Sequence, residues 1–287
     1  MAVRPWSFPA SAVPVMATLA YLQWARGGVD WIGGVWALVN IVLFHAAGNT
    51  WSDYFDFRRG VDAADTAGVT TLTGGMFRPQ EIRCLSLVLL ALAVAAGLGL
   101  LVRTGLPLLA FGVAGAALSL GYPWMKYHAM GDLDIFLTYA LLPTLGTSFV
   151  ALGAVDWSVL WLAVPIGLIT VAILHSNNTR DMRTDARVHI RTLAMQLGGR
   201  TSVVVYCLEI LVPFVWLAAC VAAGRMPWWV LVACGALMPA SAAVRQAVRY
   251  FRLGQAALVG LDEFTARLQL LFGLLLTLSF LLAVWTA

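Results

Sequence analysis

Residues 84–102 read CLSLVLLALAVAAGLGLLV, an uncharged run that lies between Arg83 and Arg103. An α-helix of this length, at about 1.5 Å per residue, spans the roughly 30 Å hydrocarbon core of a bilayer. The apolar residues are continuous and do not alternate with polar ones, as they would in a strand of a membrane barrel. The run therefore predicts a transmembrane helix.

Similar apolar runs recur along the whole chain. Of its 287 residues, 61% are hydrophobic and 11% charged, whereas a soluble domain carries about 25% charged residues. Together with a mean hydropathy of +0.85, this composition excludes a water-soluble fold. We predict an all-α, polytopic membrane protein that forms a single domain over residues 1–287 and has nine transmembrane helices. The approximate cores of these helices are 9–25, 29–48, 82–102, 106–121, 134–154, 157–176, 202–223, 227–246 and 266–286.

Charged residues are distributed unevenly across the predicted membrane. If the nine helices alternate in direction, all but three of the eighteen Lys and Arg residues lie on the side of the N-terminus. The positive-inside rule then places the N-terminus on the cytoplasmic side, together with any active site formed by the charged residues of that side, and we expect a bacterial-type inner or plasma membrane. All but three of the fourteen Asp and Glu residues share this side. Carboxylates interleaved with basic residues indicate a site that binds an anion through a cation, which a plain membrane anchor would not need.

Two further features of the chain have structural explanations. The residues before Pro9 lack the short apolar core and the small-residue cleavage site of a removable signal peptide, so we expect the first apolar segment to be retained. The four cysteines have no CxxC spacing and lie inside predicted helices. We interpret them as packing residues, not as metal ligands or disulfide partners.

Two polar stretches, at about 49–81 and 177–201, each follow the C-terminal end of an apolar helix. In the first, Asn49, Asp53 and Asp56 fall within about 60° of one another on a helix with 100° per residue. These three oxygen donors, which we call the first stripe, therefore share one face of a helix that continues beyond the second predicted span.

The second polar stretch has a similar pattern. Asn178, Asp181 and Asp185 stand at positions i, i+3 and i+7, again on one helix face, and we call them the second stripe. Asp53 and Asp181 are 128 residues apart, which corresponds to four predicted helices in each half. We interpret the two stretches as a weak internal repeat, which predicts a pseudo-symmetric bundle whose two polar helix ends face each other.

The side chains of the two stripes are suited to Mg²⁺. This ion takes oxygen ligands and is typically held by one or two carboxylates together with substrate phosphate. Two facing stripes can hold two ions across one diphosphate and neutralise it as it leaves. The alternative is two solvated helix ends with surface salt bridges, but the similar spacing and the high cost of charge near a membrane favour the metal site. The predicted metal ligands are Asn49, Asp53, Asp56, Asn178, Asp181 and Asp185, of which Asp53 and Asp181 are also predicted to be catalytic.

Basic and amide side chains near the stripes are candidates for binding a diphosphate. Guanidinium groups contact non-bridging phosphate oxygens through paired hydrogen bonds. The predicted diphosphate-binding residues are Arg58, Lys126, Arg180, Arg183, Arg191 and Asn177. Asp62 and Asp65 lie further along the first polar stretch and off its stripe, so we expect them only to help order the loop.

The motifs that contain the stripes resemble those of a known family. Residues 49–62 (NTWSDYFDFRRGVD) resemble the first Asp-rich motif of the UbiA superfamily of intramembrane prenyltransferases. Residues 177–185 (NNTRDMRTD), followed by RTLA at 191–194, resemble the second. In form both are closest to the 1,4-dihydroxy-2-naphthoate polyprenyltransferase branch, MenA, with support from RPWSFPA at 4–10 and TARL at 265–268. The resemblance covers nearly the whole chain.

The resemblance implies nine transmembrane helices around a central cavity with a lateral opening to lipid, and a dependence on Mg²⁺. The implied reaction transfers a polyprenyl group from its diphosphate to a small aromatic acceptor, and in the naphthoate branch of menaquinone biosynthesis the acceptor loses its carboxylate. No nucleic-acid partner is expected. The chain departs from the family where Ser52 replaces a common Asn and where His189-Ile190 replaces Gly-Lys. Arg187 or Arg191 is therefore expected to supply the missing charge.

Five other polar residues have weaker functional signals. Asp132 and Asp134 follow Gly131, where the family often has an acidic residue, so either is a candidate catalytic group that orients the acceptor or takes its phenolic proton. The alternative is a solvated loop cap. His45 and His175 are expected to be hydrogen-bonded packing residues. Glu209 lies within a predicted helix and is expected to face the interior of the bundle and to have a partner.

Alternative functions stay open at this point. Within the superfamily, the acceptor can be a hydroxybenzoate, homogentisate, a tetrapyrrole or glycerol phosphate, or the chain itself in a membrane terpene cyclase. A secondary transporter would also combine a weak repeat with polar residues in membrane helices. Transporter sites lie near the bilayer midplane on interrupted helices, however, whereas both stripes lie at helix ends.

Overall fold

The computed structural model describes residues 3–58, 70–187 and 190–286. Within these ranges every regular element is helical, which confirms the predicted all-α class. The α-helices are α1 (Pro9–Arg26), α2 (Trp31–Arg58), α3 (Thr70–Thr73), α4 (Pro79–Thr104), α5 (Leu108–Lys126), α6 (Gly131–Phe136), α7 (Leu142–Leu152), α8 (Leu160–Arg187), α9 (Leu193–Leu197), α10 (Gly199–Ala222), α11 (Leu237–Val248), α12 (Tyr250–Leu253) and α13 (Leu261–Thr286). The short elements are a π-helical segment, η2 (Leu137–Leu141), and the 3-10 segments η1 (Pro5–Ser7), η3 (Trp157–Val159), η4 (Trp228–Ala236) and η5 (Gly254–Leu258).

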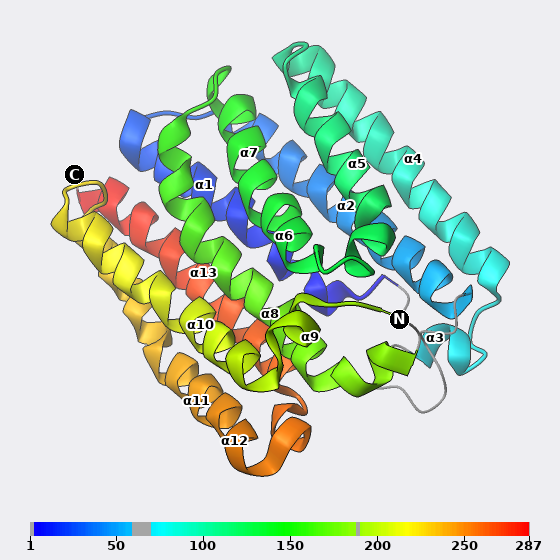
Figure 1. The fold of residues 1–287 in the computed structure, drawn as a ribbon. Helices are drawn as coiled ribbons and strands as arrows, with labels where there is room; N and C mark the ends of the chain where they lie inside the picture. Colours follow the sequence, from blue (N-terminus) through cyan, green and yellow to red (C-terminus); the bar gives the residue numbers. More distant parts are fainter. Residues whose placement is uncertain (1–2, 59–69, 188–189, 287) are drawn as a thin grey trace.

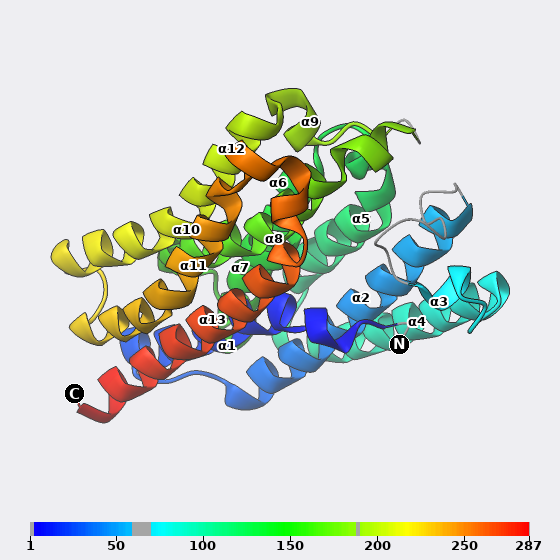
Figure 2. The ribbon, with the colours of Figure 1, turned by 90° about the horizontal axis from the view of Figure 1, so that it is seen from below.

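Eight helical stretches of the described chain are long and apolar enough to cross a membrane. They are Trp31–Arg58, Pro79–Thr104, Leu108–Lys126, Gly131–Leu152, Trp157–Arg187, Gly199–Ala222, Trp228–Leu258 and Leu261–Thr286. The first predicted span forms α1, which runs from one end of the bundle to the other (Figures 1 and 2) but is not among the eight. Gln23 and Arg26 lower the hydropathy of this helix. The protein is therefore a multi-pass membrane protein, while the predicted count of nine spans is not confirmed.

Helix α1 lies in the interior of the bundle, where it packs against α13, α7 and α2 (Figure 1). Its central residues, including Val13 and Leu22, are fully buried. Gly273 permits a close approach of α13, because a Cβ atom there would lie 2.2 Å from Val13 Cγ1. Small residues at helix contacts are typical of membrane bundles. On the outer surface, large apolar residues such as Val102 are exposed (89%), as expected where lipid covers the protein.

The two stripes lie on the two longest α-helices. α2 and α8 each have 28 residues, which corresponds to about 42 Å, more than the roughly 30 Å core of a bilayer. Each helix continues without a break through its stripe and ends at Arg58 or Arg187. This confirms the prediction that the first stripe lies on a helix that continues beyond its apolar span. The second polar stretch likewise begins as helix.

The two ends of the bundle differ in the segments that they hold. The C-terminal ends of α2 and α8 lie at the same end as the N-terminal segment (Figures 1 and 2), and we call this the stripe end. At the opposite end, which we call the far end, Arg26 forms an ion pair with Asp156 and Arg103 pairs with Asp30. The chain ends there after α13 (Figure 1). The structure thus places both stripes at one end of the bundle.

Candidate active site

The first stripe lies on the last turns of α2, where the N-terminal segment covers it. Asn49 Nδ2 donates hydrogen bonds to the carbonyl oxygen of Val3 (3.1 Å) and to Ser7 Oγ (3.0 Å). Asp53 is 2% exposed and forms an ion pair with Arg4. The segment before α1 therefore supplies both a cation and hydrogen-bond acceptors to this stripe.

Lys126, the last residue of α5, lies between the two stripes. Its Nζ donates to Asp56 Oδ2 (3.2 Å), which also accepts a hydrogen bond from Ser52 Oγ (3.3 Å). Lys126 also interacts electrostatically with Asp185, and Asp185 in turn with Asp56 and Asp181. Three helices, α2, α5 and α8, thus bring carboxylates of both stripes to one ammonium group. These carboxylates outnumber the single ammonium group, and the excess of negative charge is suited to a divalent cation.

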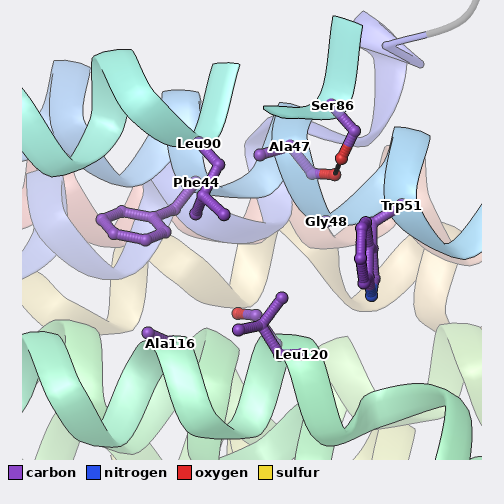
Figure 3. A pocket seen from close by; sticks show the side chains of 9 residues that line it. Phe44, Ala47, Gly48, Trp51, Ser86, Leu90, Ala116 and Leu120 are labelled. Carbon is purple, nitrogen blue, oxygen red and sulfur yellow. Dashed lines mark hydrogen bonds between the residues drawn. The ribbon is translucent and has the colours of Figure 1, made fainter. Parts of the chain in front are cut away.

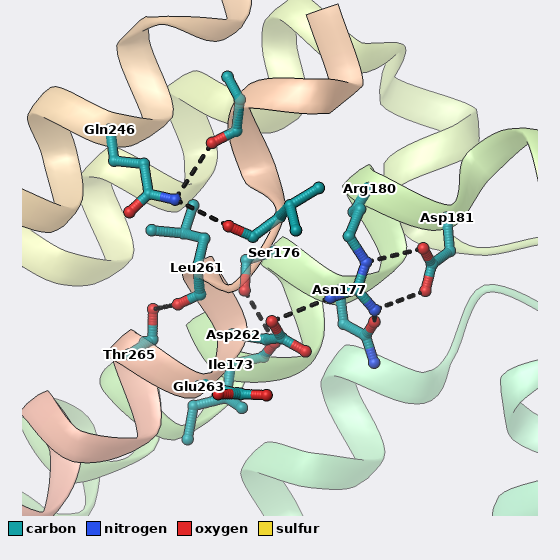
Figure 4. A network of polar contacts seen from close by, with 12 residues as sticks. Ile173, Ser176, Asn177, Arg180, Asp181, Gln246, Leu261, Asp262, Glu263 and Thr265 are labelled. Atoms are coloured by element: carbon teal, nitrogen blue, oxygen red, sulfur yellow. Dashed lines mark hydrogen bonds and ion pairs between the residues drawn. The ribbon is translucent and has the colours of Figure 1, made fainter. Parts of the chain in front are cut away.

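The second stripe is bonded to nearby residues of α8 and to α13. Arg180 donates from Nε to Asp181 Oδ1 and from Nη2 to Asp181 Oδ2, both at 2.8 Å. Arg180 Nη1 also donates to Asp262 Oδ1 (2.9 Å), and the guanidinium contacts Asn177 (Figure 4). The Asp181 side chain is 30% exposed. This network joins the end of α8 to the start of α13 and leaves Asp181 accessible.

Asp132 and Asp134 lie in the first turn of α6, which begins at Gly131, three residues before the predicted start of the helix core at residue 134. Asp132 Oδ1 accepts a hydrogen bond from Asn178 Nδ2 (3.3 Å), and Asp132 Oδ2 lies 2.6 Å from His175 Nδ1. Asp134 is 1% exposed, and no hydrogen-bond partner of its Oδ1 occurs among the described residues. Because both carboxylates are buried, neither residue is a solvated loop cap.

Not every residue predicted from the sequence belongs to this network. Arg58 Nη1 donates to Tyr54 OH (3.3 Å) on the same helix. The side chains of Arg183 and Arg191 are exposed, and Asn177 contacts Arg180. Three further residues named from the sequence lie outside the described ranges: Asp62, Asp65 and His189.

The structure adds three residues to the stripe end that the sequence did not assign to the site. They are Arg4, already described, Tyr122, which interacts electrostatically with Lys126, and Tyr139, which lies in the π segment η2 with its ring 4.7 Å from that of His45. π segments within α-helices frequently occur at functional sites. The spacing of four residues from Tyr122 to Lys126 was a usable signal, because it places both on one helix face. No local pattern connects Arg4 to Asp53.

A small apolar pocket lies between α2, α4 and α5 (Figure 3). Its walls include Phe44, Gly48 and Trp51 of α2, Leu90 of α4 and Leu120 of α5. None of the six predicted metal ligands lines it. Its chemistry suits a hydrocarbon group and not a diphosphate.

Comparison with known families decides to which family the chain belongs. The UbiA prenyltransferase family matches residues 12–259, a range that includes both stripes. The chain belongs to this family. The resemblance inferred from the two Asp-rich motifs is thereby confirmed, and as a member of the UbiA prenyltransferase family the protein is a prenyltransferase.

Similar UbiA proteins occur in animals. The chain is 36% identical over 231 residues to UbiA prenyltransferase domain-containing protein 1 of Danio rerio, a match that covers 78% of this chain and 68% of that protein. It is 34% identical over 220 residues to the Homo sapiens protein of the same name, covering 75% of this chain and 65% of that protein. The chain thus spans about two thirds of the length of these relatives. Their names do not confirm the naphthoate branch.

Solved structures of UbiA homologues share the fold. A homologue from Aeropyrum pernix K1 aligns with a TM-score of 0.69 and 17% identity over 98% of both chains. A homologue from Archaeoglobus fulgidus, bound to GPP and Mg²⁺, aligns with a TM-score of 0.60 and 11% identity, covering 96% of this chain and 98% of that one. At these identities the likeness shows the fold alone.

Proposed function

We propose that this protein transfers a polyprenyl group from its diphosphate to an aromatic acceptor in a Mg²⁺-dependent reaction. The observation that carries the proposal is the position of Lys126, which is hydrogen-bonded to Asp56 of the first stripe and interacts electrostatically with Asp185 of the second. Charged groups within membrane helices are costly and usually have a function. Further support comes from the Archaeoglobus fulgidus homologues, whose solved structures hold GPP or DMAPP with Mg²⁺.

The side chains of the stripes fit Mg²⁺ because they offer carboxylate oxygens, and the carboxylates of Asp53, Asp56 and Asp181 are each balanced by a side-chain cation. In this structure the cations are Arg4, Lys126 and Arg180. The proposed metal ligands are Asn49, Asp53, Asp56, Asn178, Asp181 and Asp185. When bound, Mg²⁺ would neutralise the developing charge of the leaving diphosphate. The cations released from the carboxylates are themselves groups that bind phosphate oxygens.

The residues of the chain bind and orient the substrate. Arg4, Lys126 and Arg180 would turn toward the non-bridging oxygens of the diphosphate, and their ion pairs with the stripes support this role. As the allylic C–O bond breaks, its electron pair leaves with the diphosphate, whose charge these side chains balance. Apolar walls around the allylic group would exclude water, which would otherwise capture the allylic cation. Further diphosphate contacts are proposed for Arg58, Arg183, Arg191 and Asn177.

Asp134 is the proposed group that takes a proton from the acceptor. Its buried Oδ1 has no hydrogen-bond partner among the described residues, and Tyr122 and Tyr139 both interact with its charge. Asp132 is engaged by His175 and is proposed as a positioning residue. We expect Asp134→Asn to lower kcat for transfer on the order of 100-fold with little change in KM for the prenyl diphosphate, as measured by steady-state kinetics. A raised KM for the diphosphate with normal kcat would show that Asp134 serves the donor instead.

The proposed acceptor is 1,4-dihydroxy-2-naphthoate, which would place the protein in menaquinone biosynthesis. The ring carbon would form a bond to the prenyl cation and lose the carboxylate as CO₂. The support is the form of the motifs at 49–62 and 177–185. We also propose that the stripe end faces the cytoplasm, because nearly all basic residues lie on that side. We also propose that the protein lies in a bacterial-type membrane, and this part of the proposal depends on the naphthoate assignment.

The test is a donor and acceptor assay with purified protein in lipid. Labelled prenyl diphosphates of several chain lengths are incubated with the naphthoate, a hydroxybenzoate, homogentisate, a tetrapyrrole or glycerol phosphate, with and without Mg²⁺. Both pyrophosphate and prenylated product are measured. We expect both only with Mg²⁺, and most product with the naphthoate. Pyrophosphate release with a cyclic hydrocarbon product would instead indicate a cyclase, and no release under any condition would contradict the proposed reaction.

A further inference from the structure

A second cluster of potential ligands lies in the interior of the bundle, next to Asn178 of the second stripe. It consists of Asp132 on α6, His175 on α8 and Glu209 on α10, which are 6%, 0% and 8% exposed. One ligand atom of each residue lies within 4.8 Å of those of the other two. Three separate helices therefore point one imidazole and two carboxylates at a common position.

The hydrogen bonds around His175 fix which nitrogen faces this position. Thr179 Oγ1 donates to the carbonyl oxygen of His175 (2.7 Å), so the contact between Thr179 and Ser202 must use the hydroxyl hydrogen of Ser202. Ser202 Oγ then accepts from His175 Nε2 (2.8 Å), which also faces the carbonyl oxygen of Ser202 (3.2 Å). Nε2 thus carries a hydrogen, and Nδ1 faces the two carboxylates. Histidine ligands of metals are oriented in this way, with the second nitrogen donating to a backbone or side-chain oxygen.

Glu209 supplies an independent indication of a ligand. Its Oε1 lies 3.8 Å from His175 Nδ1, while Oε2 is buried and has no hydrogen-bond partner in the described part of the chain. A buried carboxylate without full compensation destabilises a fold, and in a membrane helix the cost is higher. The fold keeps the Glu209 carboxylate close to a second buried carboxylate, although apolar side chains at this position would cost less free energy.

We propose that Asp132, His175 and Glu209 bind one Zn²⁺ ion. Imidazole and carboxylate ligands with an open position are typical of zinc, and imidazole favours zinc over magnesium. Ligand atoms around a tetrahedral zinc lie about 3.3 Å apart. The separations from Nδ1, 2.6 Å to Asp132 Oδ2 and 3.8 Å to Glu209 Oε1, bracket this value. Small side-chain movements bring the three atoms to zinc distances, and binding releases a proton held among them.

Such an ion would hold three membrane helices together and would also act on the second stripe. Asp132 offers Oδ2 to the ion, while its Oδ1 accepts the hydrogen bond from Asn178 Nδ2. The ion therefore fixes the orientation of Asn178, a proposed ligand of the stripes, without itself contacting the diphosphate. The zinc site does not depend on the proposed prenyl transfer, because its ligands are defined by their own geometry.

The experiment counts bound zinc in the full-length protein. Protein in detergent is stripped with a chelator, loaded with Zn²⁺, washed with a large excess of Mg²⁺ to clear the stripes, and analysed by elemental mass spectrometry. We expect about one Zn²⁺ per chain in the wild type and a loss of at least about tenfold in affinity, or about 1.4 kcal/mol, for Glu209→Gln and for His175→Asn. Glu263→Gln is the matched control, since Glu263 has a side chain that is 76% exposed, and it should retain the zinc.

A second measurement protects the test against a variant that does not fold. Co²⁺ replaces Zn²⁺ in the wild type, and its visible absorption reports four-coordinate geometry directly. An intense visible band that is lost in Glu209→Gln supports the site. The proposal is overturned if the wild type holds no zinc after the Mg²⁺ wash, if Co²⁺ shows only the weak band of a six-coordinate ion, or if folded Glu209→Gln binds as much zinc as Glu263→Gln.

Discussion

The two ends of the bundle both carry ion pairs, but they differ in burial and in charge balance. At the far end the pairs contain Arg26 and Arg103, whose side chains are 53% and 42% exposed, and each cation meets one carboxylate. At the stripe end the cations are less exposed, Arg4 at 29% and Lys126 at 18%, and Lys126 faces carboxylates of both stripes. Exposed pairs stabilise a fold by about 0–1 kcal/mol, whereas burying an ion costs several kcal/mol. The comparison indicates that the far end serves stability and the stripe end serves function.

The largest expected effect follows from removing a charge from either stripe. Asp53→Asn and Asp181→Asn should each lower product formation on the order of 100-fold or more, because Asn keeps the size of the side chain but not the negative charge that a hard cation requires. The measurement is formation of prenylated product from labelled prenyl diphosphate at fixed Mg²⁺.

The far end offers a matched control for these variants. Asp156→Asn makes the same chemical change in an ion pair with Arg26 and should leave product formation unchanged. Thermal unfolding in detergent shows whether each variant is folded. Equal losses in Asp53→Asn and Asp156→Asn would mean that the difference between the two ends is not functional.

A smaller effect is expected for Lys126→Gln. The substitution removes the ammonium group that faces Asp56 and Asp185, so the diphosphate loses one charge-assisted contact. We expect KM for the prenyl diphosphate to rise about tenfold, which corresponds to about 1.4 kcal/mol, with a smaller change in kcat. An unchanged KM would show that Lys126 balances the carboxylates without binding substrate.

Arg26→Gln tests the far end directly. It removes an exposed ion pair, so the free energy of unfolding should fall by no more than about 1 kcal/mol, with no measurable change in turnover. The measurements are the unfolding midpoint and the rate of product formation. A loss of turnover in a folded Arg26→Gln protein would connect the far end to catalysis.

The smallest expected effect is on the pH dependence of unfolding, and it involves the ion pair between Arg26 and Asp156. Burial raises the pKa of Asp156, but the hydrogen bonds from Arg26 and Ser158 outweigh it, and the pKa lies below its usual value. A lowered pKa in the folded state stabilises the protein above the unfolded pKa of about 3.9, and this stabilisation is lost as pH falls through the folded value. The unfolding midpoint should therefore fall less steeply below about pH 4 in Arg26→Gln than in the wild type. Parallel pH profiles would show that the pair contributes nothing to the acid dependence.

Much of the fold was predictable because its signals are local. Continuous apolar runs predicted the membrane helices, and the spacing of Asp53 and Asp56 predicted that α2 continues through the first stripe. The core of the fifth predicted helix was placed at residues 134–154, whereas the helix begins at Gly131. This shift moved Asp132 from a loop into a buried helical turn.

The contacts between elements were not predictable from one sequence. Arg4 and Asp53 are 49 residues apart, and Lys126 and Asp56 are 70 apart. Such pairings depend on how helices pack, which the apolar pattern of each helix does not specify. His175 was predicted as a hydrogen-bonded packing residue, and it is fully buried and hydrogen-bonded to Asp132 and Ser202. For the same reason its position between carboxylates of two other helices was not predictable.

The central claim is that the stripes hold Mg²⁺ on a prenyl diphosphate, and a Mg²⁺ titration of pyrophosphate release tests it most directly. Wild type, Asp53→Asn and Asp156→Asn are compared in the same lipid at saturating prenyl diphosphate and acceptor. The account predicts that Asp156→Asn follows the wild-type curve, while Asp53→Asn requires at least about tenfold more Mg²⁺ for half-maximal release or releases none. If Asp53→Asn gives the wild-type rate at limiting Mg²⁺, Asp53 is not a metal ligand and the stripes are solvated helix ends.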